Sequence, residues 1–125
     1  MYNEFAYFYD ELNGAANYRR LHRFVRKAFR KNGLKCGIVA DLGCGTGTLT
    51  ELLDSAGYNM IGVDISEDML SVAMDKRAES GKDILYLLQD MREFELYGTV
   101  SAVVSICDSM NYLTDPDDLV TVFKL

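Results

Sequence analysis

Three glycines alternate at positions 43, 45 and 47 of the stretch VADLGCGTGTLTE (39–51), between an apolar run and a helix-like segment. Glycine permits sharp turns and lets a ligand approach the backbone closely. Asp41 lies two residues before the turn, at the expected end of a strand. A carboxylate there repels a pyrophosphate and attracts an ammonium or sulfonium group. The pattern therefore predicts a binding turn for a cationic nucleoside that lacks phosphates.

Two phosphate-binding turns provide a comparison. A Walker A loop needs G-x-x-x-x-G-K-[ST], but the chain has no lysine between Lys35 and Lys76, which excludes kinase and NTPase chemistry. The dinucleotide fingerprint G-x-G-x-x-G/A would place its third small residue at Thr48, whereas the third glycine comes one position earlier. An NAD-binding oxidoreductase stays as an alternative, and a non-catalytic cofactor-binding or interaction fragment is a second one.

A second acid, Asp64, ends the next apolar run. A carboxylate at the end of a second parallel strand can accept hydrogen bonds from both hydroxyls of a ribose. The alternative is an ordinary acidic residue ahead of a helix cap at Ser66. We expect the ribose contact.

The cysteine pattern argues against metal and disulfide chemistry. Cys36, Cys44 and Cys107 are odd in number and lack C-x-x-C spacing, so we expect no disulfide framework, no metal site and a cytoplasmic location. With His22 as the single histidine, no second histidine can activate Cys107 as a nucleophile.

Apolar runs alternate with amphipathic segments around these acids. We expect strands over 37–42, 58–65, 83–90 and 98–108, and helices over 2–12, 17–32, 48–57, 66–81 and 115–125. Continuous apolar strands indicate a parallel sheet covered on both faces. Right-handed crossovers then predict an α/β fold: a doubly wound Rossmann-like sheet of order 3-2-1-4, with helices on both faces and two N-terminal helices.

A length of 125 residues fits one domain, with residues 1–35 as a helical cap and residues 36–125 as a Rossmann-like half. A sheet that ends at its fourth strand leaves an open apolar edge. We therefore expect a truncated portion of a longer protein, and an edge of strand four through which copies could self-associate.

Charge is unevenly distributed. The net charge is −6, yet residues 19–35 carry a dense run of lysine and arginine. Leu21, Val25 and Phe29 recur at helical spacing, which places the basic residues on the opposite, solvated face. RNA contact through 19–35 is the alternative. No apolar run approaches the ~18 residues of a membrane span, so we expect no membrane partner.

The stretch DLGCGTGTLT followed by GVDIS resembles motifs I and II of class I S-adenosylmethionine-dependent methyltransferases. LLQDMREFEL is similar to the adenine-recognising segment of that family, and SAVVSICDSMNYL to its fourth strand and the following turn. YNEFAYFYDEL, with Tyr18 beyond it, resembles a bacterial small-methyltransferase subgroup. The resemblance implies S-adenosylmethionine as cofactor and S-adenosylhomocysteine (SAH) as product.

The resemblance also implies roles for single residues. Asp41 would hold the methionyl ammonium, Asp64 the ribose, and Asp90 the adenine amine. Ile65 and Met69 would sandwich the adenine ring, with simple core packing as the alternative. The remaining cofactor contacts would come from Gly43, Cys44, Gly45, Gly47, Gln89, the Met91 N–H and the Cys107 backbone, and from Tyr9 and Tyr18 as an aromatic lid. For the two tyrosines the alternative is that they dock the N-terminal helices on the sheet.

Methyl transfer from a sulfonium is an in-line displacement that needs alignment and desolvation more than acid–base groups. Family members that methylate exocyclic amines carry a [DN]-P-P-[YFW] tetrad after strand four, whereas this chain has CDSMNYL (107–113). The difference favours a small-molecule acceptor, and no catalytic residue is assigned.

Overall fold

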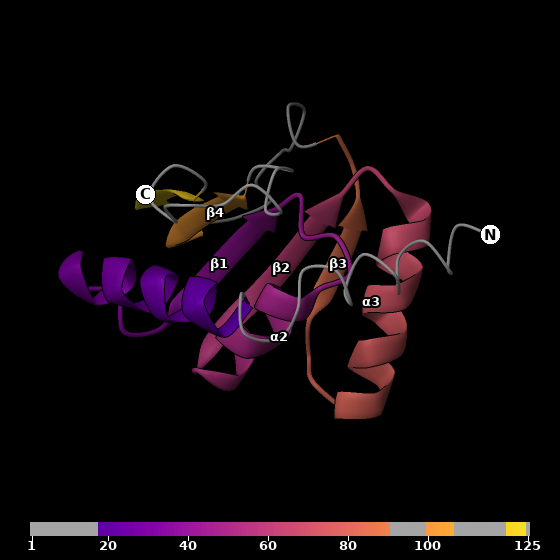
Figure 1. Cartoon of the computed structure of the whole chain (residues 1–125), viewed down its shortest axis with the longest axis horizontal. Coiled ribbons are helices and arrows are strands. Elements are labelled where there is room, and N and C mark those ends of the chain that lie inside the picture. The colour runs from indigo at the N-terminus through magenta and orange to yellow at the C-terminus, as the bar shows by residue number, and fades with distance from the viewer. Residues whose placement is uncertain (1–17, 91–99, 107–119, 125) are drawn as a thin grey trace.

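The computed structural model describes residues 18–90, 100–106 and 120–124 (Figure 1). One five-stranded sheet has the order β3-β2-β1-β4-β5. The strands are β1 (Gly37–Leu42), β2 (Tyr58–Asp64), β3 (Leu85–Leu88), β4 (Ala102–Ile106) and β5 (Val120–Lys124). The helices are α2 (Thr48–Ser55), α3 (Glu67–Ser80) and one over 18–31. The predicted order 3-2-1-4 is confirmed, and these four strands run parallel.

Strand register fixes which side chains meet. Asp41 on β1 is the partner of Gly62 on β2, and Gly62 is the partner of Tyr86 on β3. These three positions form one row across the sheet. Parallel strands bring their carboxyl ends to the same edge, so the segments after β1, β2 and β3 converge there.

The helix over 18–31 confirms the predicted amphipathic pattern. Leu21, Val25 and Phe29 are buried, whereas Arg19 and Arg23 on the same helix are exposed. The ring of Phe29 meets that of Tyr58 edge-on, with centroids 5.0 Å apart. Aromatic pairs of this geometry pack favourably, and here the contact ties the helix to the start of β2.

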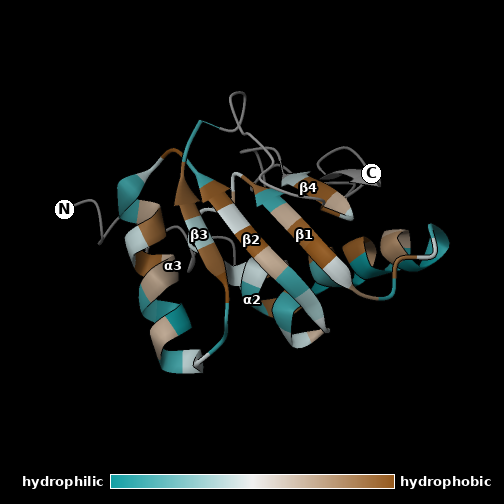
Figure 2. Cartoon of the chain, turned by 180° about the vertical axis from the view of Figure 1, so that it is seen from behind, coloured by the Kyte–Doolittle hydropathy of each residue, from teal (hydrophilic) through white to brown (hydrophobic). Residues whose placement is uncertain are grey.

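The described helices lie on one face of the sheet. Figure 1 shows helix 18–31 and α2 in front of the strands, and Figure 2, from behind, shows β1, β2 and β3 with no described helix in front of them. Two side chains that point to this rear face are exposed: Ile38 on β1 is 39% exposed and Leu85 on β3 is 53% exposed. Within the described ranges only one covering layer is seen, and the second layer stays a prediction.

The caps of α3 match the predicted boundaries. Ser66 is the N-cap, and its Oγ accepts a hydrogen bond from the Met69 N–H (3.3 Å). Gly81 ends the helix with φ 69°, a left-handed conformation that favours glycine. The helix therefore begins and ends where its capping residues dictate.

The predicted helix over 115–125 is wrong at its end, because Val120–Lys124 forms β5, antiparallel to β4. The VTVFK segment is rich in β-branched and aromatic residues, which favour strands once a partner strand is available. β5 also pairs along the whole of β4, so the open edge expected at strand four is covered. The predicted helix over 2–12 lies outside the described residues.

Candidate functional site

The turn after β1 requires its glycines. Gly43, Gly45 and Gly47 have φ values of 74°, 59° and 80°, in the left-handed region that other residues rarely adopt. The N–H groups of Gly43 and Cys44 both donate to the Val63 carbonyl, at 2.7 and 3.0 Å. The Gly47 N–H donates to the Cys44 carbonyl at 3.1 Å. The turn is thus tied to the end of β2 and folded on itself.

Asp64 completes the internal bonding of the turn. Its Oδ2 accepts a hydrogen bond from the Gly45 N–H and its Oδ1 accepts one from the Ser66 N–H, both at 2.8 Å. A phosphate-binding turn instead directs its free N–H groups at the ligand. Here the N–H groups of Gly43, Cys44, Gly45 and Gly47 are all engaged within the protein. The geometry therefore presents a carboxylate where a phosphate-binding turn presents donors.

Asp41 lies beneath the turn and is 1% exposed. Its Oδ2 accepts a hydrogen bond from the Thr50 hydroxyl (2.9 Å), while its Oδ1 is buried without a partner. The pKa of Asp41 is raised to about 7, chiefly by burial; the Thr50 hydrogen bond opposes this shift, and the nearby Asp64 charge adds to it. A buried carboxylate with an unsatisfied oxygen is strongly stabilised by a cationic partner.

A second group of predicted residues gathers at the ends of β2 and β3. The Gln89 N–H donates to the Asp64 carbonyl (3.0 Å), which holds the two strand ends together. Gln89 Oε1 is buried without a hydrogen-bond partner, and Asp90 is half-buried. Ile65 is 69% exposed, an unusual environment for a large apolar side chain, and Met69 is half-buried. This end of the site offers polar acceptors beside apolar surface.

The remaining predicted residues divide into two groups. Tyr18 is only 8% exposed and packs in the hydrophobic core with Leu21 and Val25, so its docking role is observed and its lid role stays a prediction. Tyr9, Met91 and Cys107 lie outside the described residues.

Cys44 is a packing residue of the turn. A Cβ added at Gly62 would lie 3.0 Å from its Sγ, which shows how closely the thiol approaches β2. Burial, and then the charge of Asp41, raise the pKa of the Cys44 thiol. The thiol is therefore neutral and is a poor nucleophile.

Three residues of the site escaped sequence analysis: Thr50, Gly62 and Tyr86. Thr50 contacts Asp41 only because α2 folds back over β1. Gly62 gives space to the ring of Tyr86, since a Cβ there would lie 2.5 Å from two ring carbons. Thr50 and Gly62 lie inside the stretches that resemble motifs I and II, but no role was assigned to either, and Tyr86 enters the row only through the strand register.

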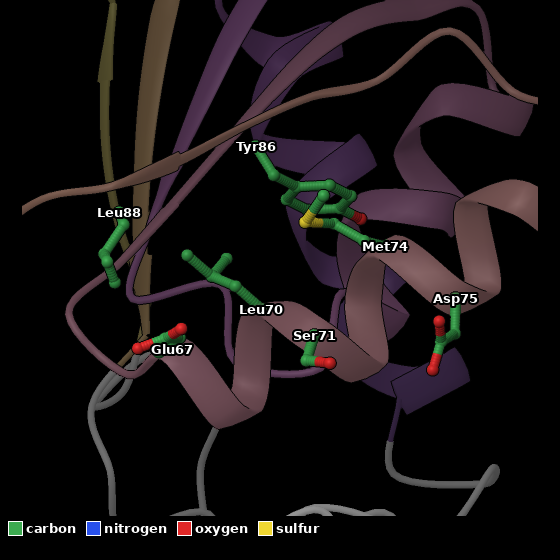
Figure 3. A pocket seen from close by; sticks show the side chains of 7 residues that line it. All are labelled: Glu67, Leu70, Ser71, Met74, Asp75, Tyr86 and Leu88. Carbon is green, nitrogen blue, oxygen red and sulfur yellow. The ribbon is translucent and has the colours of Figure 1, made fainter.

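A separate pocket of about 400 Å³ lies between α3 and β3 (Figure 3). It is lined by Glu67, Leu70, Ser71, Met74, Asp75, Tyr86 and Leu88, and by none of the turn residues. Across the described ranges, no three histidine, cysteine or acidic side chains gather closely enough to hold a metal ion. None of the helices described for this chain has the length and hydrophobicity of a membrane-spanning segment.

Comparison with known proteins agrees with this geometry. A family model described as "Methyltransferase domain" matches residues 39–124. A Bacillus subtilis protein named as a methyltransferase, YqeM, is 39% identical over 125 residues, covering 99% of this chain and 49% of that protein. The chain spans about half the length of YqeM and of a second curated relative that it matches.

Solved structures share the fold. The crystal structure of an S-adenosylmethionine-dependent methyltransferase from Clostridium acetobutylicum is 32% identical with a TM-score of 0.73, over 94% of this chain and 48% of that one. Magnesium protoporphyrin IX methyltransferase from Synechocystis, solved with bound SAH, is 26% identical with a TM-score of 0.62, over 76% of this chain and 44% of that one. The chain therefore belongs to the methyltransferase-domain family and has the class I fold of its S-adenosylmethionine-dependent members.

Proposed function

We propose that this chain binds S-adenosylmethionine at the carboxyl edge of β1, β2 and β3 and takes part in methyl transfer to a small-molecule acceptor. The observation that carries the proposal is the pair of acids around the glycine turn. Asp64 engages the N–H groups that a phosphate would need, and Asp41 keeps a buried oxygen unpartnered. Such a site fits a cationic ligand with a ribose better than a diphosphate.

The residues present fit the cofactor. Asp64 would accept hydrogen bonds from the ribose hydroxyls with its remaining lone pairs. Exposed Ile65 and half-buried Met69 would cover the adenine, with Asp90 or Gln89 accepting from its amine. Asp41 would compensate the charge of the methionyl ammonium. The cofactor supplies the activated methyl group, while the chain binds, orients and excludes water.

The acceptor class is a finer proposal. The CDSMNYL segment lacks the proline pair of amine-methylating relatives. A structural neighbour of the same class is named for a small-molecule acceptor, magnesium protoporphyrin IX. Both observations favour a small molecule. We further propose that the chain acts as one cofactor-binding domain located in the cytoplasm, with the exposed basic face of helix 18–31 solvated and not bound to RNA.

Isothermal titration calorimetry with SAH and with NADH tests the cofactor proposal. We expect SAH to bind with about 1:1 stoichiometry and NADH to give no heat of binding. The matched variants are Asp64→Ala, which removes the proposed ribose contact, and Glu67→Gln, which removes an exposed acid three residues later. NADH binding without SAH binding would instead support the oxidoreductase alternative.

A further inference from the structure

Tyr86 reaches across a strand toward the acid beneath the glycine turn. Asp41, Gly62 and Tyr86 are register partners on β1, β2 and β3, so they occupy one row of the sheet. The ring of Tyr86 lies over Gly62, where a Cβ would come within 2.5 Å of its Cδ1 and Cε1 atoms. The absence of a side chain at residue 62 is therefore what allows the phenol to extend from β3 toward β1.

The hydroxyl of Tyr86 ends in a polar cluster under the turn. A Cβ added at Gly47 would collide with the phenol oxygen, so the hydroxyl abuts the last glycine of the turn. Thr50 lies close enough to lower the pKa of Tyr86, although burial raises it more. The phenol oxygen is nevertheless buried without a hydrogen-bond partner of good geometry.

The same cluster contains an acceptor that lacks a donor. Thr50 donates to Oδ2 of Asp41 at 2.9 Å, which leaves Oδ1 buried and unpartnered. A phenol can donate one hydrogen bond, and a carboxylate oxygen can accept one. Buried polar groups in folded proteins are paired directly or through an ordered water, so the two unpartnered atoms complement one another.

We propose that Tyr86 is a positioning residue of the cofactor site. Its hydroxyl supports the turn at Gly47 and donates a hydrogen bond to the ionised carboxylate of Asp41, directly or through one water molecule. The effect of this hydrogen bond on the titration of Asp41 can be measured in the ligand-free chain. The consequence for ligand binding rests on the proposed function, because it requires that the ionised carboxylate holds a cationic cofactor.

The surroundings of Asp41 define what a change at Tyr86 should do. From β2, the Asp64 carboxylate raises the pKa of Asp41; from α2, Thr50 lowers it. Among the described residues, Cys44 in the turn and Tyr86 on β3 also feel the charge of Asp41, which raises the pKa of each after burial has done so. Removing the phenol hydroxyl takes away a donor to the charged form, so Asp41 should protonate more readily.

A cation from α3 lies over the Tyr86 ring. The Arg77 guanidinium carbon lies 5.8 Å from the ring centroid, and its Nη1 donates to the Ile84 carbonyl (2.9 Å). Substitution by phenylalanine keeps this stacking and the contact with Gly62, because both involve only the ring. Tyr86→Phe therefore isolates the hydroxyl.

The direct test follows the Asp41 carboxyl carbon by ¹³C NMR through a pH titration of the ligand-free chain, with Asp41→Asn used for assignment. We expect the midpoint in Tyr86→Phe to move up by about one pH unit relative to wild type. Thr50→Val should move the midpoint in the same direction. Tyr58→Phe is the matched control, because the Tyr58 hydroxyl donates to the Leu34 carbonyl (2.9 Å), away from Asp41. The Asp41 midpoint should not move in this variant. Coincident curves for wild type and Tyr86→Phe would overturn the proposal.

The second readout is SAH affinity between pH 5.5 and 8.5. We expect affinity to increase with pH in wild type, and the curve of Tyr86→Phe to be displaced upward in pH, with about tenfold weaker binding on the acidic side and equal binding at high pH. A purely structural role would instead lower affinity equally at every pH. If wild type binds no SAH at any pH, the proposed function fails, and the carboxyl titration still decides the role of Tyr86. If SAH binds and both proteins share one pH profile, only the role of Tyr86 fails.

Discussion

At the scale of single residues, Asp64 holds the turn, and we propose that it also contacts the ligand. Its two oxygens each accept one backbone N–H, from Gly45 and Ser66. Asparagine at 64 has a single oxygen, so it cannot satisfy both donors and also accept from a ribose. We expect Asp64→Asn to weaken SAH binding by at least tenfold, consistent with about 1.5–3 kcal/mol for a hydrogen bond to a charged group.

Calorimetry measures this loss, and Glu67→Gln provides the comparison because Glu67 is an exposed acid in the first turn of α3. That variant should bind SAH as wild type does. Equal affinities for wild type and Asp64→Asn would contradict the proposed ribose contact, whatever the effect on folding.

Asp41 should link the stability of the ligand-free protein to pH. Its pKa is raised from 3.8 to about 7, so the folded state keeps a proton that the unfolded state releases. The unfolded state is therefore favoured as pH rises between these values. We expect the free energy of unfolding to fall by about 1 kcal/mol per pH unit over this window and to level off above it.

Urea denaturation of wild type and Asp41→Asn between pH 4 and 8 isolates this contribution, because the other carboxylates cancel in the difference. Asp75→Asn, which changes an exposed aspartate on α3, is the control and should track wild type. A difference between wild type and Asp41→Asn that stays constant with pH would show that Asp41 is ionised throughout.

At the scale of elements, the packing of β3 on β2 depends on a residue without a side chain, Gly62. Gly62 does not have a positive φ, so alanine there is not strained by the backbone. Its Cβ would instead press on the Tyr86 ring at 2.5 Å. We expect Gly62→Ala to lower the free energy of unfolding by about 1–3 kcal/mol, as overpacking does.

A double-mutant cycle identifies the cause of that loss. In the Tyr86→Leu background the ring is gone, so Gly62→Ala should cost clearly less, and the coupling should appear in urea denaturation. An unchanged cost would place the strain elsewhere, for example at Cys44, whose Sγ would lie 3.0 Å from the added Cβ.

β5 offers a test that separates a strand from a helix. In a strand, successive N–H groups point to opposite sides, so only alternate residues of β5 donate to β4. We therefore expect single proline substitutions at 121, 122 and 123 to differ in their effect. Proline at a position whose N–H donates to β4 removes a ladder hydrogen bond and destabilises the fold, whereas proline at the neighbouring position removes none. Thermal unfolding measures the pattern. Similar losses at all three positions would favour the helix expected from the sequence.

At the scale of the whole molecule, patterns local in the chain predicted the fold well. Ser66 and Gly81 marked the ends of α3, and the alternating glycines marked the turn of the candidate site, because capping and left-handed turns are decided by neighbouring residues. β5 was missed because a segment forms a strand only beside a partner strand, and no pattern within 115–125 identifies β4 as that partner. Thr50 and Tyr86 were missed because their places depend on packing: α2 folds over β1 and brings Thr50 to Asp41, and the register of β1, β2 and β3 places Tyr86 in the row of Asp41.

The same assembly predicts a concerted response to ligand. The proposed contacts come from separate segments: the turn at 43–47, the β2–α3 connection at 64–66, and the end of β3 at 89–90. The first two are joined by the Gly45–Asp64 hydrogen bond, and the last two by the Gln89–Asp64 hydrogen bond. A ligand that spans them should stabilise all three together.

Hydrogen exchange with and without SAH measures this response. We expect slower exchange at the amides of Gly45, Ser66 and Gln89, each of which donates to Asp64, by a similar factor at all three. The exposed residues of helix 18–31, which make no proposed contact with the ligand, provide the internal reference and should exchange at an unchanged rate. Because all three bonds converge on one residue, protection of a single segment would mean that the ligand does not bridge the strand ends, and the arrangement proposed for it would be wrong.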